Sequence, residues 1–246
     1  MNLFIDIGNT AIKFALDDLK NVTSISTKEV IEGDFDLSFL PKGVDQVFVS
    51  SVVPKAFEKI KAKVFGKYGI LMKQEAVSND YGVYIDMDNP QELGDDLFYD
   101  LVGANATSKV PLLIVDLGTA NKFLYIDENK VFSSCAIMPG LELTLLSLSN
   151  GTALLPNVRV SGAKNIVDCH NTIDVLTASG YYSQIDSING MVQRFKNETN
   201  KDFNVLLTGG HYSLLKKDLS FSYKRVEDLC LIGIMVIARR LHHEEN

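Results

Sequence analysis

The sequence has few cysteines, no cluster of basic residues and no apolar run long enough to cross a membrane. Its 3 cysteines are widely spaced and form no Cys-x-x-Cys pair, which argues against a disulfide framework and a zinc site. We therefore expect buried free thiols in a reducing cytoplasm. The longest late apolar run covers residues 229–238, whereas a membrane-spanning helix needs about 20 residues. Because the chain enters an apolar strand at once, we also expect no signal peptide and no membrane partner.

The net charge and the length of the chain limit the expected partners and the number of domains. The formal net charge is −7, and charged residues make up 22% of the 246 residues. Nucleic acid is not an expected partner, because its phosphates bind clustered Lys and Arg side chains. A protein with this charge that binds an anionic nucleotide must use local backbone N–H groups and metal ions. The length allows one large domain or two of ordinary size, and no linker rich in Pro, Gly or Ser is present.

One short pattern occurs twice in the chain. Residues 3–10 read Leu-Phe-Ile-Asp-Ile-Gly-Asn-Thr, and residues 113–119 read Leu-Ile-Val-Asp-Leu-Gly-Thr, so Asp6 and Asp116 hold matching positions. Each copy predicts a buried strand that carries a carboxylate into a tight glycine turn. Glycine lets backbone N–H groups approach a ligand, and the carboxylate can hold a hydrated cation beside that ligand. The repeat therefore predicts a site for a nucleoside triphosphate and its metal.

The spacing of apolar residues predicts a similar order of elements in the two halves of the chain. Strands are expected at 3–5, 12–16, 46–50, 112–115, 123–126, 131–137 and 203–207. Helices are expected from Pro54, over 93–104 with Asp95 and Asp96 in the first turn, from Thr172 as N-cap to about Lys196 with Ile173 facing inward, and over 229–241. This α/β plan predicts two halves, residues 1–110 and 111–246, with a cleft between them.

A series of short motifs runs in order over nearly the whole chain. The motifs are Asp6-x-Gly8-Asn9-Thr10, Ser50-Ser51-Val52-Val53-Pro54, Asn89-Pro90 with Gly94-x-Asp96, Asp116-x-Gly118-Thr119-Ala120, Pro139-Gly140, Thr152-Ala153-x-Leu155-Pro156, Asn171-Thr172 and Thr208-Gly209-Gly210. Each motif is weak alone, but the ordered series resembles the type III pantothenate kinases. The resemblance implies the fold of the acetate and sugar kinase, heat-shock chaperone and actin superfamily: two duplicated ribonuclease-H-like halves with a nucleotide cleft between them.

The resemblance also implies an activity and its residues. Members phosphorylate pantothenate with ATP, the first step of coenzyme A synthesis, and use Mg²⁺ and a monovalent cation, K⁺ or NH₄⁺, in a homodimer. Carried over by position, the ATP-binding residues would be Asp6, Gly8, Asn9, Thr10, Lys13, Gly118 and Thr119. Asp116 would hold the monovalent cation, and Asp6 would hold Mg²⁺ through water. Pantothenate would be bound by Gly94, Asp95, Asp96, Leu97 and Thr172, with Asp96 as general base.

Several of these residues also have a purely structural interpretation. Phosphoryl transfer needs an acceptor hydroxyl held in line, and a carboxylate such as Asp96 at a helix start is well placed to accept its proton. An Asp that only interacts favourably with the helix dipole would look the same in the sequence. Thr172 could be a helix cap without a ligand, and Lys13 could face solvent. The sequence alone leaves these alternatives open.

The chain departs from the family pattern at several positions. Leu97 stands where the family usually has Arg, Met87 where an aromatic is usual, Ser134-Cys135 where Gly-Gly is usual, and Asn121-Lys122 in place of a threonine pair. A guanidinium is the natural bidentate partner for the carboxylate of pantothenate, and Leu97 removes it. Two alternatives therefore stay open: a non-catalytic nucleotide-binding relative with a regulatory role, and a kinase of the same fold with another acceptor.

Overall fold

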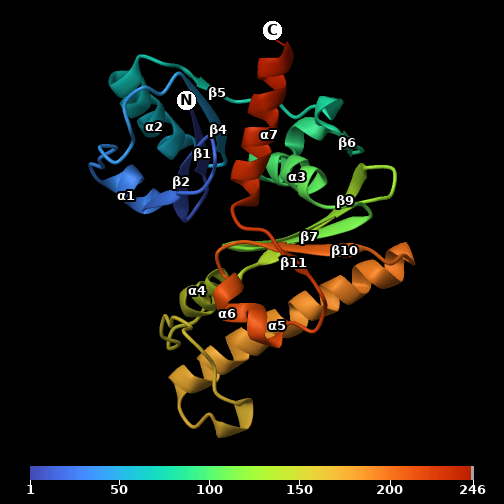
Figure 1. Ribbon diagram of the computed structural model, residues 1–246. Coiled ribbons are helices and arrows are strands. Elements are labelled where there is room, and N and C mark those ends of the chain that lie inside the picture. The colour runs from blue at the N-terminus through green and yellow to red at the C-terminus, as the bar shows by residue number, and fades with distance from the viewer. Residues whose placement is uncertain (245–246) are drawn as a thin grey trace. The chain divides into compact units, whose positions relative to one another are not determined.

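The computed structural model describes residues 1–244 and divides into two compact units (Figure 1). The first unit consists of residues 1–108, 130–133 and the C-terminal segment from Asp228 onward. The second unit consists of residues 109–129 and 134–227. These units differ from the predicted halves, 1–110 and 111–246, chiefly because the last helix packs with the first part of the chain.

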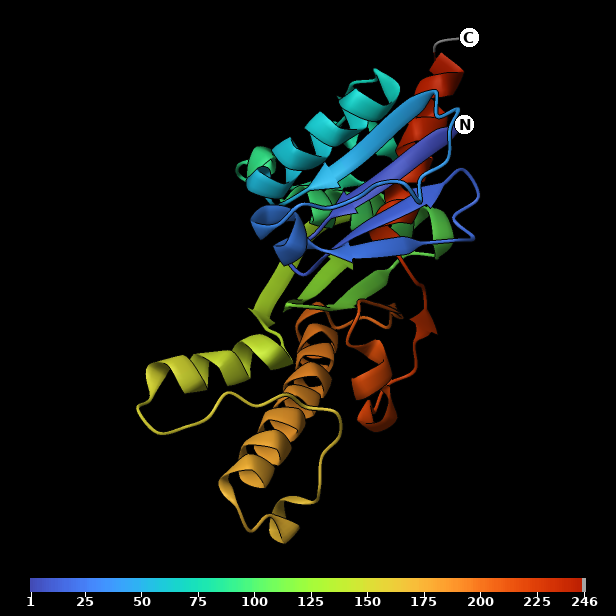
Figure 2. The same cartoon turned by 90° about the vertical axis from the view of Figure 1, so that its left-hand side faces the viewer.

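The first unit is built on a five-stranded sheet in the order β3-β2-β1-β4-β5. Its strands are β1 (Asn2–Ile7), β2 (Ala11–Leu16), β3 (Thr23–Ser26), β4 (Gln46–Ser51) and β5 (Met72–Lys73). The central strand β1 pairs antiparallel with β2 and parallel with β4. One face of the sheet carries α1 (Thr27–Glu32) and α2 (Pro54–Tyr68), and the other carries α3 (Asp95–Thr107) and α7 (Leu229–Glu244) (Figures 1 and 2).

The side chains of β1 point alternately to the two faces of the sheet. Leu3, Ile5 and Ile7 are fully buried in the apolar core that contains the inner residues of α2. Successive side chains of a strand point to opposite faces, so Phe4 and Asp6 point toward α3 and α7. The sequence pattern of β1 thus places a carboxylate on the face that these two helices cover.

Helices α3 and α7 touch backbone to backbone because each has a glycine at the contact. A Cβ added at Gly233 would lie 1.9 Å from the carbonyl oxygen of Tyr99. A Cβ added at Gly103 would lie 2.6 Å from the carbonyl oxygen of Leu229. Real Cβ atoms do not approach backbone so closely, so this contact depends on both glycines.

The second unit contributes most of a six-stranded sheet in the order β11-β10-β7-β8-β9-β6. The strands are β6 (Tyr84–Ile85), β7 (Leu112–Leu117), β8 (Ala120–Ile126), β9 (Val131–Pro139), β10 (Asn204–Thr208) and β11 (Lys224–Arg225), of which β6 and the first residues of β9 belong to the first unit. Strand β7 pairs antiparallel with β8 and parallel with β10.

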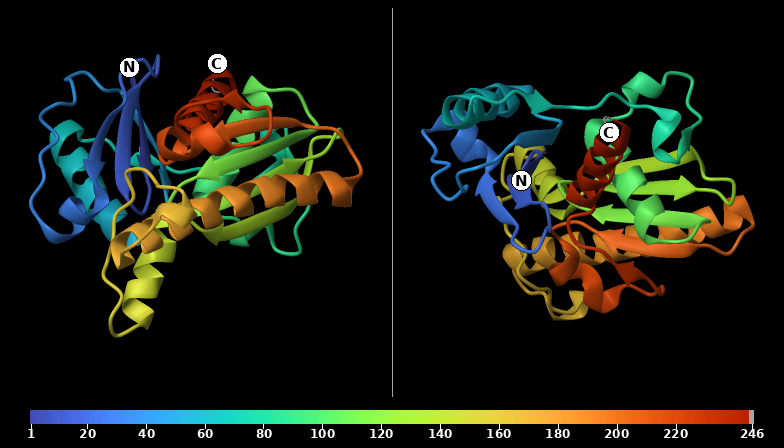
Figure 3. Two further views of the ribbon diagram at one scale, coloured as in Figure 1. Left: turned by 90° about the horizontal axis from the view of Figure 1, so that it is seen from below. Right: turned by 45° about the horizontal axis from the view of Figure 1, so that its top comes forward.

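Three helices share an apolar core with β7 in the second unit. They are α4 (Leu141–Gly151), α5 (Thr172–Thr199) and α6 (Tyr212–Leu215). The long helix α5 extends beside the sheet (Figure 3). Short 3₁₀ helices occur at Asn79–Tyr81, Pro90–Glu92, Ile166–Asp168 and Lys216–Asp218. Within residues 1–244, no helix combines the length and the apolar composition that crossing a membrane requires.

The structure confirms every predicted strand and the four predicted helices, and it corrects three details. Asn171, not Thr172, caps α5: the Asn171 side-chain oxygen accepts a hydrogen bond from the Asp174 backbone N–H at 2.9 Å. Asn is the stronger cap of the two residue types. Ile173 is 59% exposed and does not face inward. Cys230 is buried as expected, but Cys135 is exposed.

Replacing Gly233 with Ala should destabilise the protein. The added methyl group has no space against Tyr99, so α7 must move away from α3. We expect the free energy of unfolding, measured in urea, to fall by about 1–3 kcal/mol, as for other over-packed contacts. Gly190→Ala in α5 is the matched control, because no heavy atom lies within 4 Å of the added Cβ and Ala favours helices by up to about 1 kcal/mol. A Gly233→Ala protein as stable as the wild type would contradict the close helix contact.

Candidate active site

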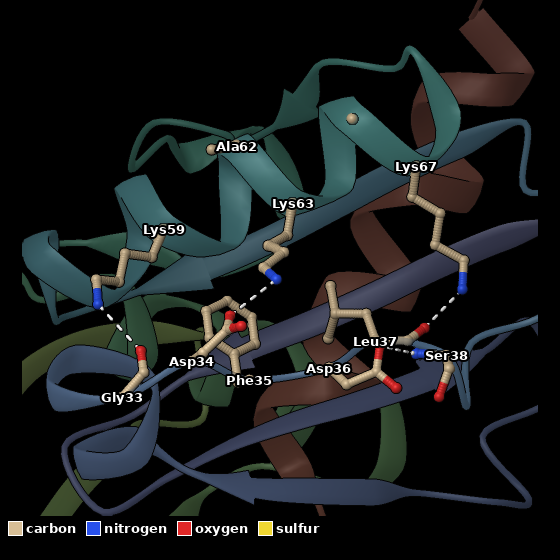
Figure 4. A pocket seen from close by; sticks show the side chains of 11 residues that line it. Gly33, Asp34, Phe35, Asp36, Leu37, Ser38, Lys59, Ala62, Lys63 and Lys67 are labelled. Atoms are coloured by element: carbon tan, nitrogen blue, oxygen red, sulfur yellow. Dashed lines mark hydrogen bonds and ion pairs between the residues drawn. The ribbon is translucent and has the colours of Figure 1, made fainter.

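One surface pocket, of about 610 Å³, lies between the loop after α1 and helix α2. It contains none of the predicted site residues. Figure 4 shows that its lysines already bind groups of the loop: Lys63 pairs with Asp34 at 3.1 Å, and Lys59 donates to the carbonyl oxygen of Gly33. Lys67 donates to the carbonyl oxygen of Leu37 at 2.6 Å. These contacts hold the loop to α2, and the predicted site residues lie elsewhere.

The first group of predicted site residues surrounds the end of β1. Asp6 is the cross-strand partner of Lys13 in the antiparallel pair of β1 and β2. The Lys13 amino group donates to Asp228 at 2.7 Å, and both side chains are about one quarter to one third exposed. Because Asp228 directly precedes α7, this ion pair ties the start of α7 to the end of the central hairpin. A lysine is therefore held beside the Asp6 turn.

The turn after Asp6 is closed by backbone hydrogen bonds and leaves its tip exposed. The Gly8 N–H donates to the carbonyl oxygen of Ala11 at 3.1 Å, and the Thr27 hydroxyl donates to the carbonyl oxygen of Gly8 at 2.7 Å. Asn9 and Thr10, at the tip, are exposed. The turn is thus rigid at its base and accessible where a phosphate would approach.

The Gly94-x-Asp96 motif has a direct geometric explanation at the start of α3. Asp96 accepts a hydrogen bond from the Leu97 backbone N–H at 2.9 Å. A Cβ at Gly94 would lie 2.9 Å from the same carboxylate oxygen, Oδ1 of Asp96, so any other residue at position 94 would displace it. Leu97 itself is only 7% exposed and belongs to the apolar interior. The motif therefore orients Asp96, and position 97 contributes its backbone rather than its side chain.

Asp95 has a structural role that separates it from its neighbour. Its carboxylate accepts hydrogen bonds from the Gln74 side chain and from the backbone N–H of Ser51 at the end of β4. Burial raises the pKa of Asp95, the two hydrogen bonds lower it, and the negative charge of Asp96 raises it. Asp95 thus connects α3 to β4, which leaves Asp96 as the better candidate for chemistry.

The thiol of Cys230 is buried and experiences the negative charge of three carboxylates of the first unit. Burial raises the pKa of Cys230 well above its usual value, and the negative charges of Asp6, Asp100 and Asp96 raise it further. These carboxylates come from β1 and α3, and Cys230 comes from α7. The charges of the predicted metal carboxylate, Asp6, and of the predicted base, Asp96, therefore both act on this thiol.

The second group of predicted residues lies at the end of β7, in the second unit. Asp116 is the cross-strand partner of Lys122 in the pair of β7 and β8, as Asp6 is of Lys13. In this unit the Lys122 amino group donates to its cross-strand partner, at Asp116 Oδ2, at 2.9 Å. The two side chains are only 18% and 14% exposed. The duplicated pattern in the sequence thus corresponds to a duplicated Asp-Lys arrangement.

Two glycines enclose the turn at Gly118-Thr119. The Gly140 N–H donates to the carbonyl oxygen of Thr119 at 2.9 Å, and a Cβ at Gly140 would lie 2.1 Å from the carbonyl oxygen of Gly118. Gly209 has a φ of +95°, and a Cβ there would lie 2.5 Å from Asp116 Oδ1. Both glycines come from motifs of the ordered series. They allow three segments of backbone to meet around this turn, while Thr119 stays exposed.

The structure therefore gathers most predicted site residues into one group in each unit. Thr172 is exposed at the first position of α5, where the capping role belongs to Asn171. The local sequence does not single out Asp228, Cys230 and Asp100, because their surroundings depend on how α3 and α7 pack against the sheet. Lys122 was noted only as a departure from the family pattern, although its place opposite Asp116 follows from the hairpin register.

Solved structures share the fold of this chain over nearly its full length. A protein from Sinorhizobium meliloti named as a 2-dehydro-3-deoxygalactonokinase superposes with a TM-score of 0.60, 10% sequence identity and coverage of 98% of this chain and 99% of that one. The pCBH ParM protein gives a TM-score of 0.52 at 10% identity, with coverage of 97% and 99%. The predicted fold class, an α/β fold of duplicated ribonuclease-H-like halves as in actin-like ATPases and sugar kinases, is confirmed.

Sequence comparison identifies the family. A type III pantothenate kinase from Acholeplasma laidlawii (strain PG-8A) is 31% identical over 250 residues, which cover 98% of this chain and 99% of that protein. The family model described as type III pantothenate kinase matches residues 2–194, a range that contains both Asp-x-Gly turns and the Gly94-x-Asp96 motif. With both turns and the Asp96 helix start in place, this chain belongs to the type III pantothenate kinase family.

Proposed function

We propose that this protein acts in the cytoplasm as a kinase that transfers the γ-phosphoryl group of ATP to the hydroxyl group of pantothenate, forming 4′-phosphopantothenate in the first step of coenzyme A synthesis. Besides family membership, two carboxylates of the first unit support this most directly: Asp6 near the end of β1, and Asp96, which the Leu97 N–H orients at the start of α3. The reaction needs a charge-neutralising site for phosphate and a group that positions the acceptor hydroxyl, and these two carboxylates suit the two tasks. The 3 free cysteines suit a reducing compartment.

Asp96 would accept the proton of the attacking hydroxyl group. Its carboxylate sits in the first turn of α3, and the Leu97 N–H fixes one of its oxygens. A carboxylate group in this position can accept a proton from a hydroxyl group held against it. Because proton transfer is late in phosphoryl transfer, the larger contribution of Asp96 would be to hold the hydroxyl in line with the phosphorus.

Each of the two glycine turns offers donors that suit the phosphate groups of ATP. Asn9 and Thr10 in the first unit and Thr119 in the second are exposed at the tips of turns whose bases are fixed by hydrogen bonds. Backbone N–H groups in such turns bind anions without a basic side chain, as a chain with a net charge of −7 requires. Lys13, held beside the Asp6 turn by Asp228, would add one positive charge.

Mg²⁺ fits the donor chemistry of the first unit. Carboxylate oxygens are the ligands that this ion prefers, and it usually keeps several waters and binds one or two carboxylates plus substrate phosphates. Asp6, near the end of β1, would hold such a hydrated ion through water. When bound, Mg²⁺ would neutralise the charge that develops on the phosphate oxygens. For Asp116 in the second unit, the family implies a monovalent cation.

The carboxylate of pantothenate must be bound by a residue other than Leu97. The Leu97 side chain is apolar and 7% exposed, so it offers no hydrogen-bond donor and little accessible surface. Gly94 and Asp95 would serve the substrate indirectly: Gly94 leaves room for the Asp96 carboxylate, and Asp95 fixes the start of α3. These roles make Asp96 the residue of this motif that contacts the acceptor.

The homodimer that the family implies would use an apolar surface of the second unit. We name this surface the α4–α5 patch; its exposed large side chains are Leu143, Leu146, Leu148, Leu154, Ile166, Val167, Ile173 and Val175. These are 8 of the 14 exposed large apolar side chains reported for the described residues. All of them come from one stretch of chain, residues 143–175, and exposed apolar side chains concentrated in this way suit an interaction site. Thr172 lies within this stretch, so its predicted contact with pantothenate would be made near the dimer interface.

Purified protein with ATP, Mg²⁺ and pantothenate, in buffer containing both potassium and ammonium salts, should form 4′-phosphopantothenate. Mass spectrometry of the product and coupled measurement of ADP would both report it, and boiled enzyme is the control. Two outcomes would contradict this expectation: ADP formation that does not depend on pantothenate, or no phosphorylated product. Either outcome would favour a non-catalytic nucleotide-binding relative or a kinase with another acceptor.

Asp96→Asn should lower the turnover number by about 10²–10⁴-fold, the usual effect of losing a general base. ATP affinity, measured by titration calorimetry, should change little, because Asn keeps the shape and the hydrogen bond from Leu97. Asp95→Asn is the matched control and should retain most of the turnover, since Asn can still bind Gln74. If Asp95→Asn abolished turnover while Asp96→Asn did not, the two roles would have to be exchanged.

Ile173→Asp should convert a dimer into a monomer. A carboxylate in the centre of an apolar interface loses its water without gaining a partner, which opposes association. Light scattering coupled to gel filtration measures the mass directly. Phe65→Asp is the matched control: Phe65 is 53% exposed, close to the 59% of Ile173, but lies on α2 outside the α4–α5 patch. A monomeric wild-type protein would refute the proposed dimer.

A further inference from the structure

The monovalent cation that the family implies at Asp116 does not fit the side chains present there. The Lys122 amino group already donates to Asp116 Oδ2 at 2.9 Å. A lysine ammonium group has only hydrogen-bond donors and cannot act as a ligand for a cation. It carries the same unit positive charge as K⁺, so a second monovalent cation on this carboxylate would be repelled.

The other oxygen of the Asp116 carboxylate, Oδ1, lies close to the backbone of Gly209. Gly209 approaches Asp116 Oδ1 so closely that a Cβ at position 209 would lie 2.5 Å from it. The Lys122 and Asp116 side chains are 18% and 14% exposed, which weakens solvent screening of their interaction compared with a surface ion pair. The carboxylate therefore has an ammonium group on one oxygen and closely packed backbone at the other.

We propose that the ammonium group of Lys122 replaces the monovalent cation, so that this enzyme binds ATP and turns over without added K⁺ or NH₄⁺. Chemically, the Lys122 side chain is a tethered primary ammonium ion, and its place opposite Asp116 is set by the register of β7 and β8. The tether makes the positive charge permanent at any salt concentration. This inference rests on the proposed kinase function, but the Asp116 site can also be tested without turnover.

The first measurement is steady-state turnover in potassium, ammonium and tetramethylammonium chloride at one ionic strength. Wild-type rates should differ by less than about twofold among the three salts. Lys122→Met removes the charge and keeps an unbranched side chain; it should be at least about tenfold slower in tetramethylammonium chloride and should recover in K⁺ or NH₄⁺. Lys201→Met is the matched control, because Lys201 pairs with Glu128 on the surface of the same unit, and its rates should follow the wild type in every salt.

The second measurement is the unfolding temperature, which requires no turnover. A ligand that binds only the folded protein raises this temperature in a saturable way. Titration of KCl against tetramethylammonium chloride at fixed ionic strength should give no saturable rise for the wild type and a saturable rise for Lys122→Met. If Lys122→Met does not fold, Lys122→Gln serves the same purpose.

The two measurements separate failure of the inference from failure of the kinase assignment. Stimulation of the wild type by K⁺ of more than about tenfold, or a saturable rise of its unfolding temperature with K⁺, would overturn the role of Lys122. A folded Lys122 variant that responds to K⁺ no more than the wild type in the unfolding measurement would also overturn it. A protein that forms no product in any salt would refute the kinase function, and the unfolding measurement would still decide whether Lys122 takes the place of the cation.

Discussion

The site depends on one repeated constraint: a carboxylate at the end of a buried central strand has to be balanced by positive charge. Asp6 and Asp116 end β1 and β7, whose remaining residues are almost all buried. In both units the hairpin register puts a lysine directly opposite the carboxylate. An ionised group so close to a core costs free energy unless it is paired, hydrated or bound to a metal. The choice among these three partners distinguishes the chemistry of the two units.

The two units solve this problem differently. In the first unit, the Lys13 amino group binds Asp228, and the negative charges of Asp6, Asp100 and Asp96 all act on the buried thiol of Cys230. A neighbourhood with this much negative charge attracts a hydrated divalent cation. In the second unit, Lys122 binds Asp116 itself. Duplication of one hairpin thus yields a lysine that binds the residue before α7 in the first unit, and a carboxylate whose charge is balanced by its cross-strand lysine in the second.

The sequence was sufficient for the strands, the turns and the candidate acidic residues, because these follow from local patterns. The alternation of side chains in β1 predicts that Asp6 lies on the opposite face of the sheet from Leu3 and Ile5. The glycine that follows each Asp predicts the turn. Contacts between distant segments could not be predicted in this way. The ion pair of Lys13 with Asp228 joins residues 215 positions apart, and nothing in the local sequence around either residue indicates it.

The glycines show where sequence patterns have long-range causes. Gly94, Gly140 and Gly209 occur in short motifs that are weak individually, and the structure gives each a steric reason: a Cβ would strike the Asp96 carboxylate, the Gly118 carbonyl group and the Asp116 carboxylate, respectively. In the second unit, the clashing atoms belong to a distant part of the sequence: Gly140 and Gly209 both meet the segment from Asp116 to Gly118. A motif of this kind specifies how closely two segments approach, and it thereby fixes the carboxylates to which a cation, free or tethered, must bind.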